Sequence, residues 1–278
     1  MPFVSPLILQ VFDRHYDAGK EVFGELTKKI KSKKSIELEE HLFLFEIFVL
    51  LLAKIHFKNK NLIHDTFSEF KRLQKNLKKV RHIRMIENAF HVYFGDLKEN
   101  FKEYEKNIVS DKKNIYTNVY EIILSIPLQV WEDLYRDLMH LSKEITALAL
   151  NTASTQIINE EMEYFHFDTK SRLDPPNIHD IFRGLKKVTS IEKIRLSVGL
   201  NAVFTHKVHQ QMDQLMQTLE GWYNNHIIYQ HLAHFLRDRE NIDKKYQYVL
   251  TAIKNSHKER TKEVENGCAL LFTEMLLH

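Results

Sequence analysis

The chain has few residues that interrupt a helix. Its 278 residues include only 7 glycines and 5 prolines, and no stretch collects enough of either to form a linker. Such scarcity is typical of long helices joined by short polar turns. Alternating apolar and polar residues, which would indicate strands, are essentially lacking as well. The sequence therefore predicts an all-α bundle, with 44% hydrophobic residues available for a sizeable core.

Cysteine and excess charge are also scarce. The single Cys268 excludes an intrachain disulfide and a cysteine-built zinc site. The formal net charge is only +3, so the protein as a whole is not expected to attract nucleic acid strongly, and specific nucleic-acid binding is not predicted. Any binding of a polyanion must then come from local clusters of basic residues.

Long apolar runs are lacking too. The most apolar stretch, Leu42 to Ala53, contains Glu46 and precedes Lys54, whereas a membrane span needs about 20 apolar residues. Near the N-terminus, Leu7-Ile8-Leu9 is too short for a secretion signal and lacks a basic lead. We therefore predict a cytoplasmic protein with no membrane partner.

Helical periodicity extends over nearly the whole sequence. Pro127 is expected to kink or split a long helix, and residues 110–114 are expected to form a turn. The segment Asp174-Pro175-Pro176-Asn177 is the clearest break between helices. The predicted helices cover residues 11–31, 38–57, 63–94, 96–108, 116–150, 157–167, 178–204, 206–236 and 243–277.

A short phrase occurs twice and opens a helix each time. Ile63-His64-Asp65 begins one segment and Ile178-His179-Asp180 begins another, and both continue into a basic run. A weak duplication of this kind indicates one helical unit used twice. Because helical residues advance about 100° each, every copy separates into a polar and an apolar side. The polar sides carry the candidate binding residues, which are His64, Lys71, Arg72, Lys75, Lys78 and Lys79 in the first copy and His179, Arg183, Lys186, Lys187 and Lys193 in the second.

The first basic run contains no acidic residue that could offset its positive charge. From Lys71 to Arg84 the sequence contains no aspartate or glutamate, so no ion pair can form within the run. Such a face is self-repulsive and is most easily explained by an anion or acidic partner that neutralises it. The alternative is a solvated face, or one that pairs with Glu99, Glu103 or Glu105 of the next helix.

These repeated segments resemble the CHAD family, the conserved histidine α-helical domains. That family has two similar helical halves, each with a helix that opens with histidine and continues with spaced Arg and Lys. A further segment, Leu219 to Ile227, is similar to a family motif that follows the second such helix. The resemblance implies one CHAD-like domain over residues 1–278, with halves at 1–173 and 174–278 packed around a basic cleft. It also implies binding of inorganic polyphosphate or another phosphate-rich polyanion, without catalysis, cofactor or metal.

The chain departs from the family pattern at several positions. Phe67 and Phe182 stand where the family commonly has arginine, and Gln74 and Thr189 replace a later arginine. In the third motif, Tyr223 and Asn224 replace histidine and aspartate. The basic set is therefore thinner here than in the family.

Other functions remain open at this stage. The His-Asp pairs could belong to a metal-dependent helical phosphohydrolase, and His231 with His234 could contribute to a metal site. No glycine-rich phosphate loop, serine nucleophile elbow or thiolate site is found. A structural or protein-binding bundle that has lost the anion site is the main alternative to polyanion binding.

Overall fold

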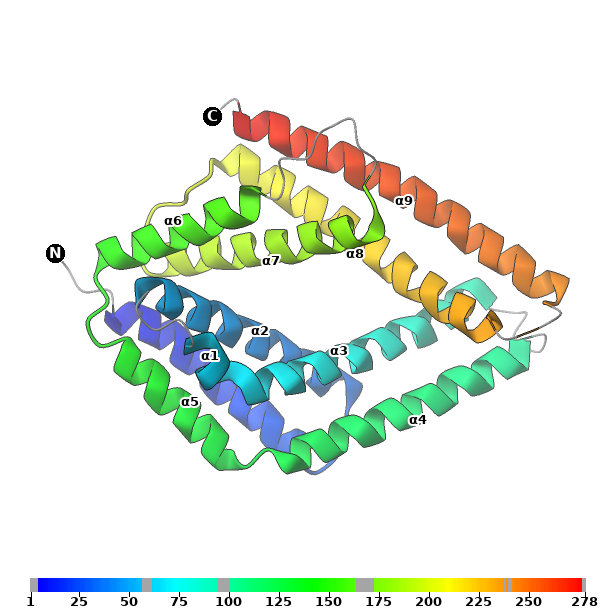
Figure 1. Ribbon diagram of the computed structural model, residues 1–278, viewed down its shortest axis with the longest axis horizontal. Coiled ribbons are helices and arrows are strands. Elements are labelled where there is room, and N and C mark those ends of the chain that lie inside the picture. The colour runs from blue at the N-terminus through cyan, green and yellow to red at the C-terminus, as the bar shows by residue number, and fades with distance from the viewer. Residues whose placement is uncertain are drawn as a thin grey trace. The chain divides into compact units, whose positions relative to one another are not determined.

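The structure, a computed structural model, describes residues 5–56, 62–94, 101–163, 173–237, 239 and 242–276. Within these ranges every regular element is a helix and no strand occurs, which confirms the all-α prediction (Figure 1). The helices of the described residues are α1 (Ser5–Leu26), α2 (Ser32–Ile55), α3 (Leu62–Phe94), α4 (Lys102–Ser125), α5 (Leu128–Leu141), α6 (Ala147–Glu163), α7 (Pro175–Ser197), α8 (His206–Leu236) and α9 (Lys244–Leu276).

Several helix boundaries differ from those expected. Pro127 does split the long segment, because it is the residue before α5 and adopts an extended backbone. The expected turn at residues 110–114 is wrong, since α4 continues through it. Its lysines and Asn114 are compatible with a helix interior, and neither glycine nor proline interrupts it. A second break, at residues 142–146 between α5 and α6, was not expected.

The chain divides into two compact units, which are described separately. The first contains Met1–Arg81, Lys112–Asn159 and Ser190–Val203, and the second contains His82–Asp111, Glu160–Thr189 and Phe204–His278. The predicted division at residue 173/174 concerns the family's halves and stays a prediction. No helix within the described ranges is long and apolar enough to cross a membrane.

The core of the first unit is built around Trp131 of α5. Its ring is fully buried and lies 5.2 Å from Phe23 of α1, 6.0 Å from Phe45 of α2 and 5.1 Å from Phe70 of α3, measured between ring centroids. The Tyr16 hydroxyl also donates a hydrogen bond to the Trp131 carbonyl oxygen. Aromatic side chains from four helices therefore hold the first unit together, and α1 lies beside α2 (Figure 1).

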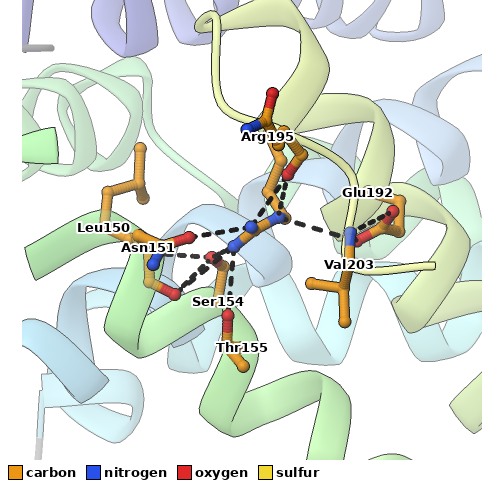
Figure 2. Close-up of polar contacts among 8 residues, drawn as sticks. Leu150, Asn151, Ser154, Thr155, Glu192, Arg195 and Val203 are labelled. Carbon is orange, nitrogen blue, oxygen red and sulfur yellow. Dashed lines mark hydrogen bonds and ion pairs between the residues drawn. The ribbon is translucent and has the colours of Figure 1, made fainter. Parts of the chain in front are cut away.

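A buried arginine fixes the end of α7 in the same unit. Figure 2 shows the guanidinium of Arg195 surrounded by oxygen atoms, which come from α6 and from the turn after α7. Its Nη2 lies 2.8 Å from Asn151 Oδ1 and 2.9 Å from the Asn201 carbonyl oxygen, and its Nη1 lies 2.5 Å from Ser154 Oγ. These charge-assisted hydrogen bonds connect the end of α7 to α6.

The glutamate beside Arg195 completes this network. Glu192 Oε1 lies 3.6 Å from Arg195 Nε, and both side chains are at most 5% exposed. The Val203 N–H donates to both carboxylate oxygens of Glu192 at 3.1 Å. Gly199, with φ of 79°, permits the sharp turn that brings this N–H back to the helix.

In the second unit, α8 and α9 lie side by side in opposite directions (Figure 1). Trp222 of α8 is fully buried, and its indole N–H donates to Thr261 Oγ1 of α9 at 3.1 Å. A Cβ at Gly221 would lie 2.6 Å from the Arg260 guanidinium, so this flexible side chain of α9 would have to shift to accommodate it. The α8–α9 pair is the frame of the second candidate site described below.

Candidate functional site

The first candidate face lies on α3. Phe70, Leu73, Leu77 and Val80 are all at most 1% exposed, so the apolar side of the helix is buried as the sequence predicts. The opposite side carries exposed side chains of Lys71, Arg72, Lys75 and Lys79, with Lys78 half-buried beside them. His64 lies in the first turn of α3, where the side chains fall outside the described residues.

The four exposed cations of α3, which are Lys71, Arg72, Lys75 and Lys79, form no ion pair with a carboxylate of the described residues. Lys79 Nζ instead donates to the neutral Asn76 Oδ1 at 2.8 Å. From Lys71 to Lys79 the face extends about 12 Å along the helix. We call these four residues the α3 basic face.

Of the acids expected to relieve this run, Glu103 has another partner and Glu99 lies outside the described residues. Glu103 pairs with Arg239 at 2.7 Å. Arg81 lies beyond the α3 basic face and pairs at 3.1 Å with the buried Glu39 of α2, a contact that the sequence did not indicate. Only the C-terminal part of the run is therefore neutralised by this glutamate.

The second candidate face, on α7, has different surroundings. Ile178, Ile181, Leu185 and Val188 are fully buried, again as predicted. On the polar side, Arg183 and Lys193 are exposed and Lys186 is half-buried. The Lys187 ammonium, however, lies 2.5 Å from the carboxylate of Glu161, and both side chains are at most 23% exposed. Lys187 is thus already neutralised within the protein.

His179 lies in a pocket of about 380 Å³ in the second unit. The pocket is formed by the first turn of α7 and one side of α8. Its lining residues are Pro175, Pro176, His179, Asp180, Tyr223, His226, Ile227 and Gln230. Three of its residues, Tyr223, His226 and Ile227, belong to the segment that resembles the third CHAD motif, but the sequence analysis did not identify them as site residues.

A second histidine of the pocket also contacts a histidine of α9. His226 Nδ1 lies 3.0 Å from His257 Nε2, and the His226 ring stacks on Trp222 with an interplanar angle of 11°. Burial lowers the pKa of His226 to about 4, with smaller contributions from the nearby His257 and His179. Burial also lowers the pKa of His257. Both rings are therefore neutral at pH 7.

One further polar chain, in the second unit, superficially resembles catalytic machinery. The Tyr104 hydroxyl lies 2.9 Å from His231 Nδ1, and His231 Nε2 lies 3.2 Å from Asp111 Oδ2. Tyr104 is 1% exposed, and burial raises its pKa, so its hydroxyl is neither ionised nor accessible to a substrate. We interpret this chain as a structural network that satisfies buried polar groups.

The metal sites considered from the sequence gain no support. Within the described ranges, no three His, Cys, Asp or Glu side chains are grouped so that they could hold a metal ion. His231, one of the histidines considered, is instead engaged by Tyr104 and Asp111.

Comparisons with known proteins find no family model that matches the chain and no curated protein with significant similarity. The resemblance to the CHAD family therefore stays a prediction from the residues. The structure does explain two of the departures from that pattern. Phe67 is buried in the core, and the buried Gln74 donates a hydrogen bond to Glu46 of α2 at 3.3 Å.

Proposed function

We propose that the protein binds an extended, phosphate-rich polyanion and does not chemically change it. Inorganic polyphosphate is the ligand that the CHAD resemblance implies. The observation that supports this proposal most is the α3 basic face, where four exposed cations lie along about 12 Å of helix without an acidic partner among the described residues.

The physical basis is multivalent charge pairing. Lysine and arginine side chains spaced by one helical turn can each meet a different phosphate of one chain. Without the ligand, Lys71, Lys75 and Lys79 repel one another at i,i+4 spacing. A bound polyanion relieves this repulsion and releases its own counterions, so both effects favour the complex.

The polar side of α7 supplies the second set of cations in this proposal. Arg183 and Lys193 are its exposed members, and His179 and Lys186 complete it. A basic channel between two helical halves, which the resemblance implies, is part of the proposal. If such a channel exists, one ligand chain binds per protein molecule, whereas two independent faces bind two.

The competing function is a structural or protein-binding bundle. It is favoured by the contacts of Lys187 with Glu161 and of Arg81 with Glu39, which show that part of the basic set is used internally. In that case the α3 basic face is only solvated, and no polyanion binds it tightly.

Titration of the whole chain with long-chain polyphosphate separates these alternatives. If four cations of α3 pair with phosphates, raising the salt from about 50 to about 200 mM should weaken binding roughly 50-fold. Isothermal calorimetry gives both this salt dependence and the stoichiometry. No binding at the lower salt would overturn the proposal and leave the scaffold function.

A further inference from the structure

The pocket at His179 differs from both basic faces because it is a hollow lined mainly by uncharged side chains, both polar and apolar. The backbone at the start of α7 offers few N–H groups to a ligand in this pocket. Pro175 and Pro176 have no N–H, and the Asn177 N–H is taken by the Asp174 carboxylate at 2.9 Å. Any anion in the pocket must therefore be bound by side chains, of which His179, His226 and Gln230 can donate hydrogen bonds.

We propose that this pocket binds a terminal phosphate group, and that the His226–His257 pair takes up one proton as the phosphate binds. The ligand class rests on the proposed polyanion function, because a polyphosphate chain ends in such groups. The volume of about 380 Å³ has room for a chain end, whereas the α3 basic face runs along a helix and can accommodate an extended chain.

The two histidines form a device that can hold one extra proton. With both rings neutral, a single N–H is shared across the 3.0 Å contact between His226 Nδ1 and His257 Nε2. If the shared hydrogen is on His226 Nδ1, a further proton on the same ring leaves this hydrogen bond to His257 in place. The protonated ring then has a second N–H, at Nε2, and a positive charge for an anion. A second proton on His257 would break the contact, so uptake stops at one.

Burial lowers the pKa of both rings and keeps the pair neutral when the pocket is empty. Of the charged and titratable groups around the pair, His179 and Asp180 come from α7, with their side chains 3.8 Å apart, and the Arg260 guanidinium, which covers Gly221, comes from α9. From α3 comes His82, which binds the Tyr223 hydroxyl at 2.8 Å. Asp180 is the only carboxylate among the lining residues, and it is mainly exposed. A phosphate would bring the negative charge that a protonated His226 lacks here.

Proton uptake is measured directly by calorimetry on the whole chain at about pH 6, in two buffers with different ionisation enthalpies. Inorganic phosphate and tripolyphosphate are the phosphate probes. Sulfate is the third probe, because its charge is constant over the range in which histidine titrates. Any proton taken up with sulfate therefore belongs to the protein and not to the ligand.

We expect uptake of about one proton per ligand, with affinity for sulfate rising by up to about tenfold per pH unit as the pH falls. In His226→Gln the uptake disappears, and tripolyphosphate binds roughly tenfold more weakly. The matched control, His234→Gln, changes an exposed histidine of the same helix outside the pocket and should behave as the wild type. Binding without proton uptake, or equal behaviour of the two variants, overturns the proposal.

Two further measurements test the pocket without the variant and separate it from the proposed function. If His226→Gln does not fold, the NMR shifts of the His226 ring in the wild type must move to those of a protonated imidazole on adding phosphate, and unchanged shifts refute the pocket. Long-chain polyphosphate at neutral pH tests the proposed function independently. If long-chain polyphosphate binds but the His226 ring shifts do not change, only the pocket proposal is refuted. If phosphate binds in the pocket but long-chain polyphosphate does not bind, the polyanion function is refuted and the pocket is a site for free phosphate.

Discussion

The helices α3 and α7 both contain the phrase Ile-His-Asp near their N-terminal ends, yet their polar sides have different surroundings. On α3, Lys71, Arg72, Lys75 and Lys79 are exposed and have no acidic partner among the described residues. On α7, Lys187 pairs with Glu161 and Arg195 is buried against α6. Sequence similarity between the copies therefore does not imply equal function, because neighbouring helices decide which cations remain available.

In this comparison, the largest expected change in stability comes from replacing the buried arginine of α7. Arg195→Ala should lower the free energy of unfolding by about 3–5 kcal/mol, because Glu192 would remain buried and without its positive partner. Urea unfolding followed by circular dichroism measures the change. Arg183→Ala, at an exposed position of the same helix, should stay within about 0.5 kcal/mol of the wild type. A loss below about 1 kcal/mol in Arg195→Ala would show that the network contributes little.

The next effect concerns the histidines of the second unit. The pKa of His226 is about 4 in the folded protein and below its ordinary value of 6.5. Since the unfolded chain binds this proton first, the associated stability is complete above pH 6.5 and is lost as the pH falls through about 4. Because the ring is only half-buried, solvent screening reduces the effect to about 1–2 kcal/mol.

Unfolding experiments at neutral and acidic pH test this linkage. In His226→Gln, the free energy of unfolding that is lost between the two pH values should be about 1–2 kcal/mol smaller than in the wild type. His234→Gln provides the control, with the full loss retained. An unchanged loss in His226→Gln would mean that His226 titrates normally in the folded protein.

The smallest effect compares one lysine from each helix. Lys187→Ala should destabilise the protein by about 1 kcal/mol or less, because it leaves Glu161 partly buried without its partner. Lys75→Ala should leave stability unchanged or raise it by about 0.3 kcal/mol, because it removes repulsion from Lys71 and Lys79. For polyphosphate affinity the order is reversed, and only Lys75→Ala should weaken binding. Equal effects of the two substitutions on both quantities would remove the distinction between the helices.

The buried sides of α3 and α7 could be predicted from the sequence, because 3.6-residue periodicity directly reports an apolar face. The split at Pro127 was also predictable, since proline removes a backbone hydrogen bond. The contacts of Lys187 with Glu161 and of Arg195 with Asn151 were not, because they join residues on different helices. A single sequence contains the charges but does not indicate which helix lies next to which.

The same reasoning applies to the pocket. Its polar members come from α7 and α8, and the histidine behind His226 comes from α9. Only His179 was identified beforehand, because it opens a repeated phrase. Tyr223 and His226 lie in the segment that resembles a family motif but were not identified as site residues, and no spacing distinguished His257 among the 16 histidines of the chain.

The most direct test of the account reverses the charge of two lysines on each of two helices. The double variant Lys71→Glu and Lys75→Glu changes the α3 basic face, whereas Lys254→Glu and Lys258→Glu changes exposed lysines of α9 at the same spacing and by the same total charge. Affinity for long-chain polyphosphate at low salt should fall about tenfold or more in the first variant and stay within about twofold in the second. An equal loss in both variants would contradict the account, because binding would then follow net charge and not the α3 basic face.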